Sequence, residues 1–174
     1  MADAPEVQRL AGSPEVASTT LNVPHPYEDG MAEAWISRHA LEFEEKKMLV
    51  LAITFGNRLV GAISLRLEPE QRRAELGYWI GRPYWGQGYA TEAVAAVLAF
   101  GFASLGLNRI QATHVTRNPA SGRVMQKAGM LFEGIQREHF WKNGRPETIA
   151  RYAILATDPR PDAGTAAGPP RRGS

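Results

Sequence analysis

The sequence predicts an α+β domain followed by a flexible tail. Two pairs of apolar, strand-like runs are each joined by a turn that contains Asn and Gly. Between these pairs, apolar residues recur at the spacing of helices. Residues 158–174 are rich in Pro, Gly and Ala and have no apolar period, so burial there cannot offset the loss of chain entropy. We therefore expect a single domain over residues 1–157 and a flexible tail over residues 158–174.

The N-terminal part of the domain is predicted to be helical. Residues 4–17 read as one or two short helical pieces around a Gly-Ser-Pro sequence. Prolines in residues 23–27 require an extended loop, because proline fixes its own φ and restricts the residue before it. From Tyr27 to Lys46, apolar residues at a helical spacing predict one longer helix with an apolar and a charged face.

The rest of the domain alternates strands with helices. Gly56-Asn57-Arg58 is expected to turn the first hairpin, and Asn143-Gly144 the second. The expected elements are strands at 48–55, 59–65 and 73–80, a helix at 89–105, a strand at 109–116, a helix at 120–128, and strands at 130–140 and 147–155.

Composition excludes several classes of protein. The chain has no cysteine and its four histidines are scattered, so we expect neither a disulfide framework nor a metal site. The formal charge of +2 is mild and no basic stripe is visible, so a nucleic-acid partner is not expected. The N-terminus lacks a signal-peptide pattern, and the longest apolar run, 93–107, is short for a membrane span and contains glycines. These features favour a cytoplasmic protein without a membrane partner.

The most informative stretch runs from Glu75 to Val94. It reads as a strand, a tight turn that contains Gly86 and Gly88, and the start of a helix. Backbone N–H groups exposed at such a helix start, together with the helix dipole, form a site for an anion such as a pyrophosphate. Glycines also end strands and cap helices in proteins that bind nothing, so this element alone leaves both interpretations open. Neither a P-loop nor a complete dinucleotide fingerprint is present.

Three motifs in order resemble the GNAT superfamily of acetyl-coenzyme A (acetyl-CoA) N-acetyltransferases, and within it the branch of the ribosomal-protein N-terminal acetyltransferases. Trp85–Ala90 (Trp-Gly-Gln-Gly-Tyr-Ala) is similar to the family's pyrophosphate loop, although many relatives have Arg or Gln in place of Trp85. Asn118–Ser121 matches an Asn-x-x-Ser motif, and Gln126–Met130 resembles the Glu-Lys-x-Gly-Phe ending. The resemblance covers about Ala4 to Leu155.

This resemblance implies a three-layer fold with a mixed, mostly antiparallel central sheet and helices on both faces. The strand at 74–80 would lie beside the strand at 109–116, and the two would splay apart. The strand that opens many relatives is missing before the first helix. The implied reaction transfers an acetyl group from acetyl-CoA to a primary amine, either a protein N-terminus or a small-molecule amine. A homodimer is one expectation, because dimers are frequent among similar proteins.

The resemblance also implies which residues hold acetyl-CoA. Backbone groups near Trp79, Ile80 and Arg82 would bind the pantetheine arm, and one N–H at the splay would polarise the thioester carbonyl. The pyrophosphate loop comprises Trp85, Gly86, Gln87, Gly88, Tyr89, Ala90 and Thr91. Asn118, Ser121 and Lys127 would add further contacts, although Asn118 and Ser121 could equally cap a helix and Lys127 could be a solvated charge.

Two residues are candidates for catalysis. An alkylammonium must lose a proton before it attacks, and Glu75 is the candidate base, with a pairing to Arg73 as the structural alternative. The leaving thiolate needs a hydrogen-bond donor. Met125 stands where much of the superfamily has Tyr, so Ser121, one turn earlier, is the candidate acid.

The acceptor site is the least defined part of the prediction. The resemblance implies that Tyr27 and Trp35 form one wall of the amine site, with His139, Trp141 and Tyr152 opposite. These aromatic residues could instead be ordinary core. A second hypothesis, favoured by Met125, is a non-catalytic module that binds acyl-CoA without turnover.

Overall fold

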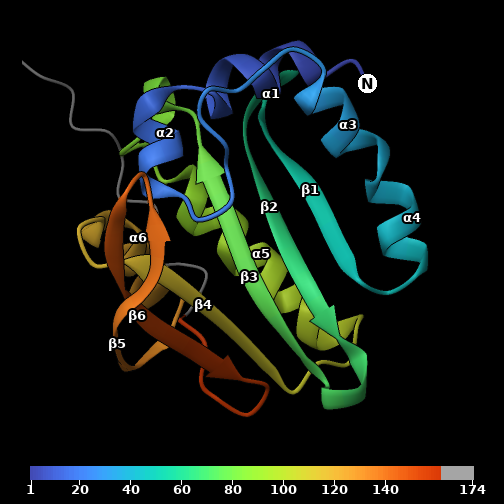
Figure 1. Cartoon of the computed structure of the whole chain (residues 1–174). Helices are drawn as coiled ribbons and strands as arrows, with labels where there is room; N and C mark the ends of the chain where they lie inside the picture. The colour runs from blue at the N-terminus through green and yellow to red at the C-terminus, as the bar shows by residue number, and fades with distance from the viewer. Residues whose placement is uncertain (162–174) are drawn as a thin grey trace, which may run out of the picture.

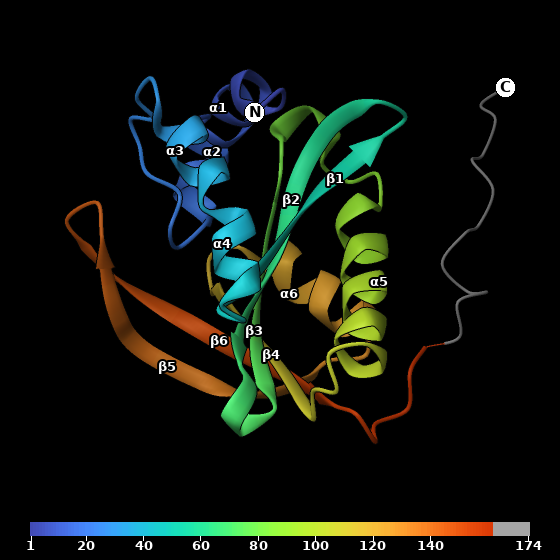
Figure 2. The same ribbon diagram turned by 90° about the vertical axis from the view of Figure 1, so that its right-hand side faces the viewer.

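The structure is a computed structural model in which residues 1–161 are described. A six-stranded sheet lies between a layer of N-terminal helices and a layer formed by two later helices (Figures 1 and 2). The expected three-layer α+β fold is therefore confirmed. Most of the predicted flexible tail, residues 162–174, lies outside the described residues. Of its first residues, Arg160 packs its guanidinium 4.2 Å from the centre of the Phe102 ring.

The first layer consists of four short helices, and here the predicted helix from Tyr27 to Lys46 is wrong. The helices are α1 (Ala4–Ala11), α2 (Pro14–Thr19), α3 (Met31–Ser37) and α4 (His39–Glu44). Gly30 adopts a left-handed conformation with φ of 83°, so no helix can run through it, and α3 begins after it. At Arg38 the backbone N–H bonds to Ile36 and Trp35 instead of a residue four positions back, which separates α3 from α4.

The sheet has the strand order β1-β2-β3-β4-β6-β5. Its strands are β1 (Met48–Phe55), β2 (Arg58–Glu68), β3 (Arg73–Ile80), β4 (Arg109–Val115), β5 (Leu131–Lys142) and β6 (Arg145–Leu155). All pairings are antiparallel except the parallel pairing of β3 with β4. Within residues 1–161 no strand precedes α1, as the sequence predicted.

The opposite face of the sheet is covered by α5 (Tyr89–Ala103) and α6 (Pro119–Lys127), visible behind the strands in Figure 1. Gly101 is among the buried residues of α5, whereas the neighbouring Phe100 is 40% exposed. A Cβ at Gly101 would lie 2.8 Å from Ile110 Cδ1, so glycine allows α5 to pack closely on β4. The main core lies between these helices and the sheet and includes Leu65, Val94, Leu98, Ile110 and Ile154.

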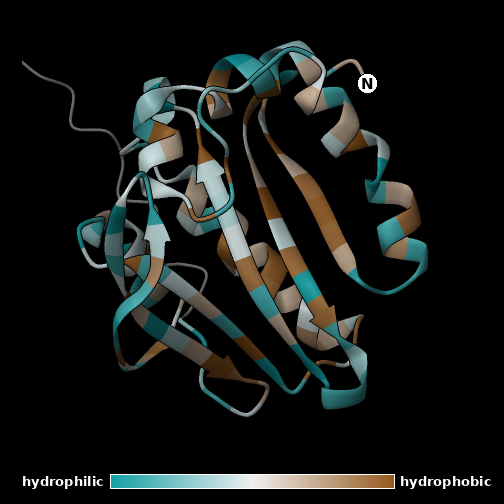
Figure 3. Cartoon of the chain, viewed as in Figure 1, coloured by the Kyte–Doolittle hydropathy of each residue, from teal (hydrophilic) through white to brown (hydrophobic). Residues whose placement is uncertain are grey.

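A second, smaller core lies on the other face, under the N-terminal helices. It is formed by Ala4, Val7, Ala11, Ala32 and Leu59, with Tyr27, Trp35 and Trp79 partly buried against it. Figure 3 shows apolar residues along β1 and β2 between the layers, whereas the far end of the β5–β6 hairpin is hydrophilic. The N-terminal helices are therefore held on the sheet by apolar packing near one edge and leave room beside β3.

Candidate active site

A cavity of about 810 Å³ lies between the N-terminal helices, the middle of the sheet and the starts of α5 and α6. It reaches both faces of the sheet, because its lining includes Trp35 from the first layer and Ser121 from the last. The physical basis for this opening is the way in which β3 meets β4.

The two central strands splay apart. Only the first halves are paired, from Arg73 with Arg109 to Leu76 with Ala112. Beyond Leu76, β3 remains paired with β2 as far as Ile80, and β4 remains paired with β6 as far as Val115. The backbone groups of residues 77–80 that face β4 therefore have no partner strand there. An extended ligand such as a pantetheine arm can bond to such an edge as an added strand would.

A glycine turn lies at the open end of this gap. Gly86 and Gly88 both have left-handed φ values, 76° and 93°, and among the described residues only their own chain neighbours lie within 4 Å of the place where a Cβ would be. Gly88 caps α5, and no side chain within residues 1–161 bonds to the N–H groups of the first turn of this helix. With 15 residues, α5 is long enough for its dipole to place a partial positive charge at this turn. A diphosphate fits this site, because the free N–H groups and the open space are both present.

The structure brings most predicted site residues into this one cavity. Its lining includes Glu75, Trp79, Ile80, Trp85, Gly86, Gly88, Tyr89, Ala90, Thr91, Asn118, Ser121 and Lys127, together with Tyr27 and Trp35. Two predicted cofactor residues, Arg82 and Gln87, do not line it. Arg82 stacks over the Trp85 ring at 4.9 Å, and Gln87 Nε2 donates to the Pro83 carbonyl at 3.0 Å. Their side chains therefore stabilise the turn from outside.

Trp85 has a contact that the sequence did not reveal. Its indole N–H donates to the Ile80 carbonyl oxygen at 2.6 Å, across the short 3-10 turn Arg82–Tyr84. The Trp side chain therefore fixes the glycine turn to the end of β3, in place of the polar contact that Arg or Gln would make there. It also gives the Ile80 carbonyl a partner within the chain.

Glu75 lies on the face of β3 that looks toward the N-terminal helices. Side chains alternate along a strand, and Trp79, four residues later on the same face, packs against the smaller core. Arg73, the alternative partner of Glu75, is bonded to Glu68 instead, with its Nε 2.8 Å from Oε2. Among residues 1–161, Glu75 has no ion pair within 4.0 Å.

Ser121 lies on the other face, in the first turn of α6. Its Oγ is 2.8 Å from the hydroxyl of Tyr78, which also donates to the Ser121 carbonyl at 3.0 Å. Burial raises the pKa of Tyr78 to about 12, against the smaller lowering effect of its hydrogen bond to Ser121. Asn118 is the N-cap residue of α6, but its side chain makes no capping bond.

Sequence reasoning missed Tyr78. It lies in the half of β3 that is paired with β2 but not with β4, on the same face as the core residues Ala74 and Leu76. The strand alternation could have placed its side chain toward the helices that follow β3. What no local pattern could supply is the meeting of residues 78 and 121, which are 43 positions apart.

The predicted acceptor residues lie in two places. Tyr27 and Trp35 line the cavity and also pack against the smaller core, so their part in acceptor binding stays a prediction. The opposite wall is wrong, since His139, Trp141 and Tyr152 do not line the cavity. Trp141 is 73% exposed on β5, an edge strand that is separated from β4 by β6. The rim is formed instead by residues 19–24, which run from the last residue of α2 into the loop after it.

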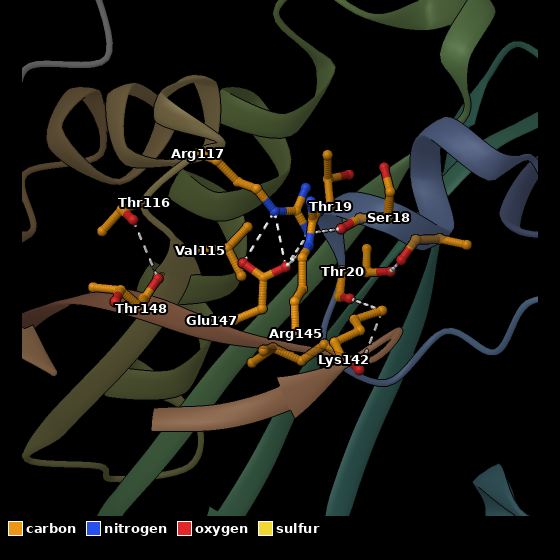
Figure 4. Close-up of polar contacts among 12 residues, drawn as sticks. Ser18, Thr19, Thr20, Val115, Thr116, Arg117, Lys142, Arg145, Glu147 and Thr148 are labelled. Atoms are coloured by element: carbon orange, nitrogen blue, oxygen red, sulfur yellow. Dashed lines mark hydrogen bonds and ion pairs between the residues drawn. The ribbon is translucent and has the colours of Figure 1, made fainter. Parts of the chain in front are cut away.

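A polar clasp holds this rim in place (Figure 4). Glu147, only 5% exposed, accepts from Arg117 Nε at 3.0 Å and from Arg145 Nε at 3.1 Å. Arg117 also donates to the Ser18 carbonyl, and Lys142 donates to the Thr20 carbonyl. The hydrogen bond from Arg117 holds the pKa of Glu147 below its usual value. We call Ser18, Arg117, Arg145 and Glu147 the Glu147 clasp.

Comparison with known proteins decides the family. The family model described as "Acetyltransferase (GNAT) domain" matches residues 1–131. The chain belongs to the GNAT acetyltransferase family. YoaA of Bacillus subtilis, which is named as an uncharacterized N-acetyltransferase, is 40% identical over 127 residues, covering 71% of this chain and 72% of YoaA. The predicted resemblance is thus confirmed.

Two solved structures share the GNAT fold. RimL, a ribosomal L7/L12 alpha-N-protein acetyltransferase in complex with coenzyme A, superposes with a TM-score of 0.81 at 20% identity and covers 88% of this chain and 89% of its own. Spermidine N-acetyltransferase from Vibrio cholerae, in complex with CoA and spermine, gives 0.77 at 21% identity and covers 90% and 92%. No helix in the described part of this GNAT acetyltransferase is both long and apolar enough to cross a membrane.

Proposed function

We propose that this GNAT acetyltransferase transfers an acetyl group from acetyl-CoA to a primary amine by direct attack, with Glu75 as the general base. One observation carries the proposal: the gap between β3 and β4 connects the free helix start of α5 with the face that bears Glu75, within one cavity. The relatives' names and the coenzyme A in the RimL complex support the same reaction.

Acetyl-CoA fits the residues on the α5 and α6 side. The N–H groups of Tyr89, Ala90 and Thr91 at the start of α5 would hold the pyrophosphate, and residues 77–80 would hold the arm. Lys127 and Arg123 line the same part of the cavity and would add positive charge near the phosphates. Bound acetyl-CoA supplies the activated acetyl group.

The proton acceptor and the hydrogen-bond donor of the proposed reaction lie on opposite faces of the sheet. Glu75 would accept the proton of the attacking amine, directly or through water, from the side of the N-terminal helices. Ser121 would donate a hydrogen bond to the sulfur from the side of α6. The acceptor and the cofactor would thus enter from opposite faces and meet in the gap.

The charges of the cavity favour an acceptor with a single positive group. Glu75 is the one carboxylate among the described residues that line it, whereas Arg38 and Arg66 are also part of the lining. Arg66 is the cross-strand neighbour of Glu75. A polyamine would leave its further ammonium groups beside guanidinium groups, which repel them. We therefore infer that the acceptor is a neutral or acidic peptide N-terminus.

The general test is thiol release from acetyl-CoA. We expect saturable binding of acetyl-CoA in calorimetry and release of free thiol when a suitable amine is added. Binding without release, over a panel of peptides, amino acids and polyamines, would identify the chain as the non-catalytic acyl-CoA module that Met125 suggested. Absence of both binding and release would contradict the proposal as a whole.

The acceptor preference has its own test. We expect Arg66→Glu to raise the ratio of spermidine rate to neutral-peptide rate by about 10-fold, which corresponds to about 1.4 kcal/mol. Arg137→Glu, on β5 and outside the cavity lining, is the matched charge reversal and should leave the ratio unchanged. Wild-type enzyme that prefers spermidine would refute the inferred acceptor and leave the acetyl transfer intact.

Two expectations about the whole protein stay predictions. A homodimer would most simply use β5, one of the two edge strands, on which Phe132, Ile135 and Trp141 are exposed. The second of these expectations is a cytoplasmic location.

A further inference from the structure

We propose that Tyr78 is a positioning residue of the transfer reaction, whose hydroxyl sets the direction in which the Ser121 hydroxyl donates its hydrogen bond. The inference rests on the proposed function, since it assigns a further residue to the same site. Tyr78 and Ser121 both line the cavity, and their oxygens are 2.8 Å apart.

The hydroxyl pair has two hydrogen-bonding arrangements. Tyr78 has two acceptors within reach, the Ser121 carbonyl at 3.0 Å and the Ser121 Oγ at 2.8 Å. When Tyr78 donates to the carbonyl, Ser121 donates back to Tyr78, and its hydrogen is used within the pair. When Tyr78 donates to Oγ, the Ser121 hydrogen is free to point into the cavity. Both arrangements satisfy the buried Tyr78 hydroxyl, so little free energy separates them.

Negative charge on the sulfur, in the gap between β3 and β4, favours the second arrangement, in which Tyr78 donates to the Ser121 Oγ. In the transfer, the ammonium first passes one proton through Glu75 to water, then the C–N bond forms and the C–S bond breaks. The second N–H proton goes to Glu75, and the electron pair of the C–S bond leaves on sulfur. Ser121 then donates to that charge, and Tyr78 donates to Ser121, so the two hydrogen bonds polarise each other. Water protonates the thiolate after release. Because burial raises the pKa of Tyr78 to about 12, the phenol keeps its proton and remains a donor throughout the working pH range.

Tyr78 should strengthen the binding of the coenzyme A sulfur and should not affect the binding of the rest of coenzyme A. Tyr78→Phe removes the hydroxyl and keeps the ring, which packs against the main core. We therefore expect wild-type affinity for coenzyme A to rise between pH 6 and pH 9 as the bound thiol ionises, and Tyr78→Phe to reduce that rise by about 10-fold, the typical effect of one charge-assisted hydrogen bond. Desulfo-coenzyme A, which has no sulfur, should bind equally to both proteins.

Calorimetry with coenzyme A and desulfo-coenzyme A is the decisive measurement, because it needs no turnover. Ser121→Ala should reproduce the same loss, which keeps the test available if Tyr78→Phe does not fold. The double variant should lose no more than the more affected single variant, since the two hydroxyls act as one unit. Equal losses for both ligands, or additive losses in the double variant, would overturn the proposal.

Kinetics give a second readout. We expect Tyr78→Phe to lower kcat by about 10-fold with the KM for acetyl-CoA within about 2-fold of wild type. Ser37→Ala, which removes an exposed hydroxyl that lies outside the cavity lining and donates to the Ala34 carbonyl, is the control and should be neutral. If no acceptor supports turnover, the proposed function fails, yet the calorimetric difference still decides the role of Tyr78.

Discussion

Glu75→Gln is expected to lower kcat with a peptide acceptor by about 100- to 1,000-fold at pH 7, the range of a lost general base. The substitution keeps the size of the side chain and removes its ability to accept a proton. Glu75 faces the acceptor side of the sheet and the pyrophosphate turn lies beyond the end of β3, so the affinity for acetyl-CoA should stay within about 2-fold of wild type.

The loss should also depend on pH in a defined direction. A peptide α-amine has a pKa of about 8, so above about pH 9 the amine has already lost its proton in water and needs the base less. The deficit of Glu75→Gln should therefore shrink from pH 7 to pH 9.5. Glu68→Gln, which removes the carboxylate bonded to Arg73 on the neighbouring strand, is the control and should retain activity. An unchanged rate, or a deficit that is constant with pH, would remove Glu75 from proton transfer.

Glu147→Gln is expected to have the largest effect on stability, lowering the free energy of unfolding by about 2–3 kcal/mol at pH 7. It weakens the bonds to Arg117 and Arg145 and leaves their charges uncompensated. This loss of stability is smaller than the ~3–5 kcal/mol for breaking a fully buried pair, because the Arg117 and Arg145 side chains are 32% and 58% exposed. Denaturant titration measures the free energy of unfolding of both proteins. Glu133→Gln, which breaks an exposed pair with Arg109, should cost under about 1 kcal/mol.

The contribution of Glu147 should be lost in acid. Its pKa is lowered in the folded protein, chiefly by the hydrogen bond from Arg117, from a usual value of 4.5. The carboxylate therefore stabilises the fold above pH 4.5, and this contribution disappears as the pH falls through the lower folded value. The stability gap between wild type and Glu147→Gln should narrow below pH 4.5 and be constant above about pH 6. A gap that widens in acid would contradict the clasp.

Because Arg117 of the clasp bonds to the carbonyl of Ser18, directly before the rim at residues 19–24, loss of the clasp should also reach the acceptor site. We expect Glu147→Gln to raise the KM for the acceptor while the affinity for acetyl-CoA stays within about 2-fold. A raised KM with unchanged acetyl-CoA affinity would distinguish an effect on the rim from an effect on the glycine turn, which lies at the start of α5 and shares no residue with the clasp.

The sequence by itself determined the strands, the two later helices and the position of the glycine turn before α5. Strand alternation, the two glycine-bearing hairpin turns and the Trp85–Ala90 motif depend on residues close together in the chain, so their positions could be predicted. The predicted helix from Tyr27 to Lys46 was wrong because the prediction followed the apolar spacing and not Gly30, whose left-handed backbone interrupts the helix.

The tertiary structure alone decided how these elements meet. That β3 and β4 separate after Leu76, that Glu75 and Ser121 lie on opposite faces, and that Tyr78 meets Ser121 follow from packing across the sheet. The same holds for the bond from Arg117 to Ser18, which joins positions 99 residues apart. Such contacts depend on which surfaces are buried together, and burial is a property of the whole fold that no local pattern of residues records.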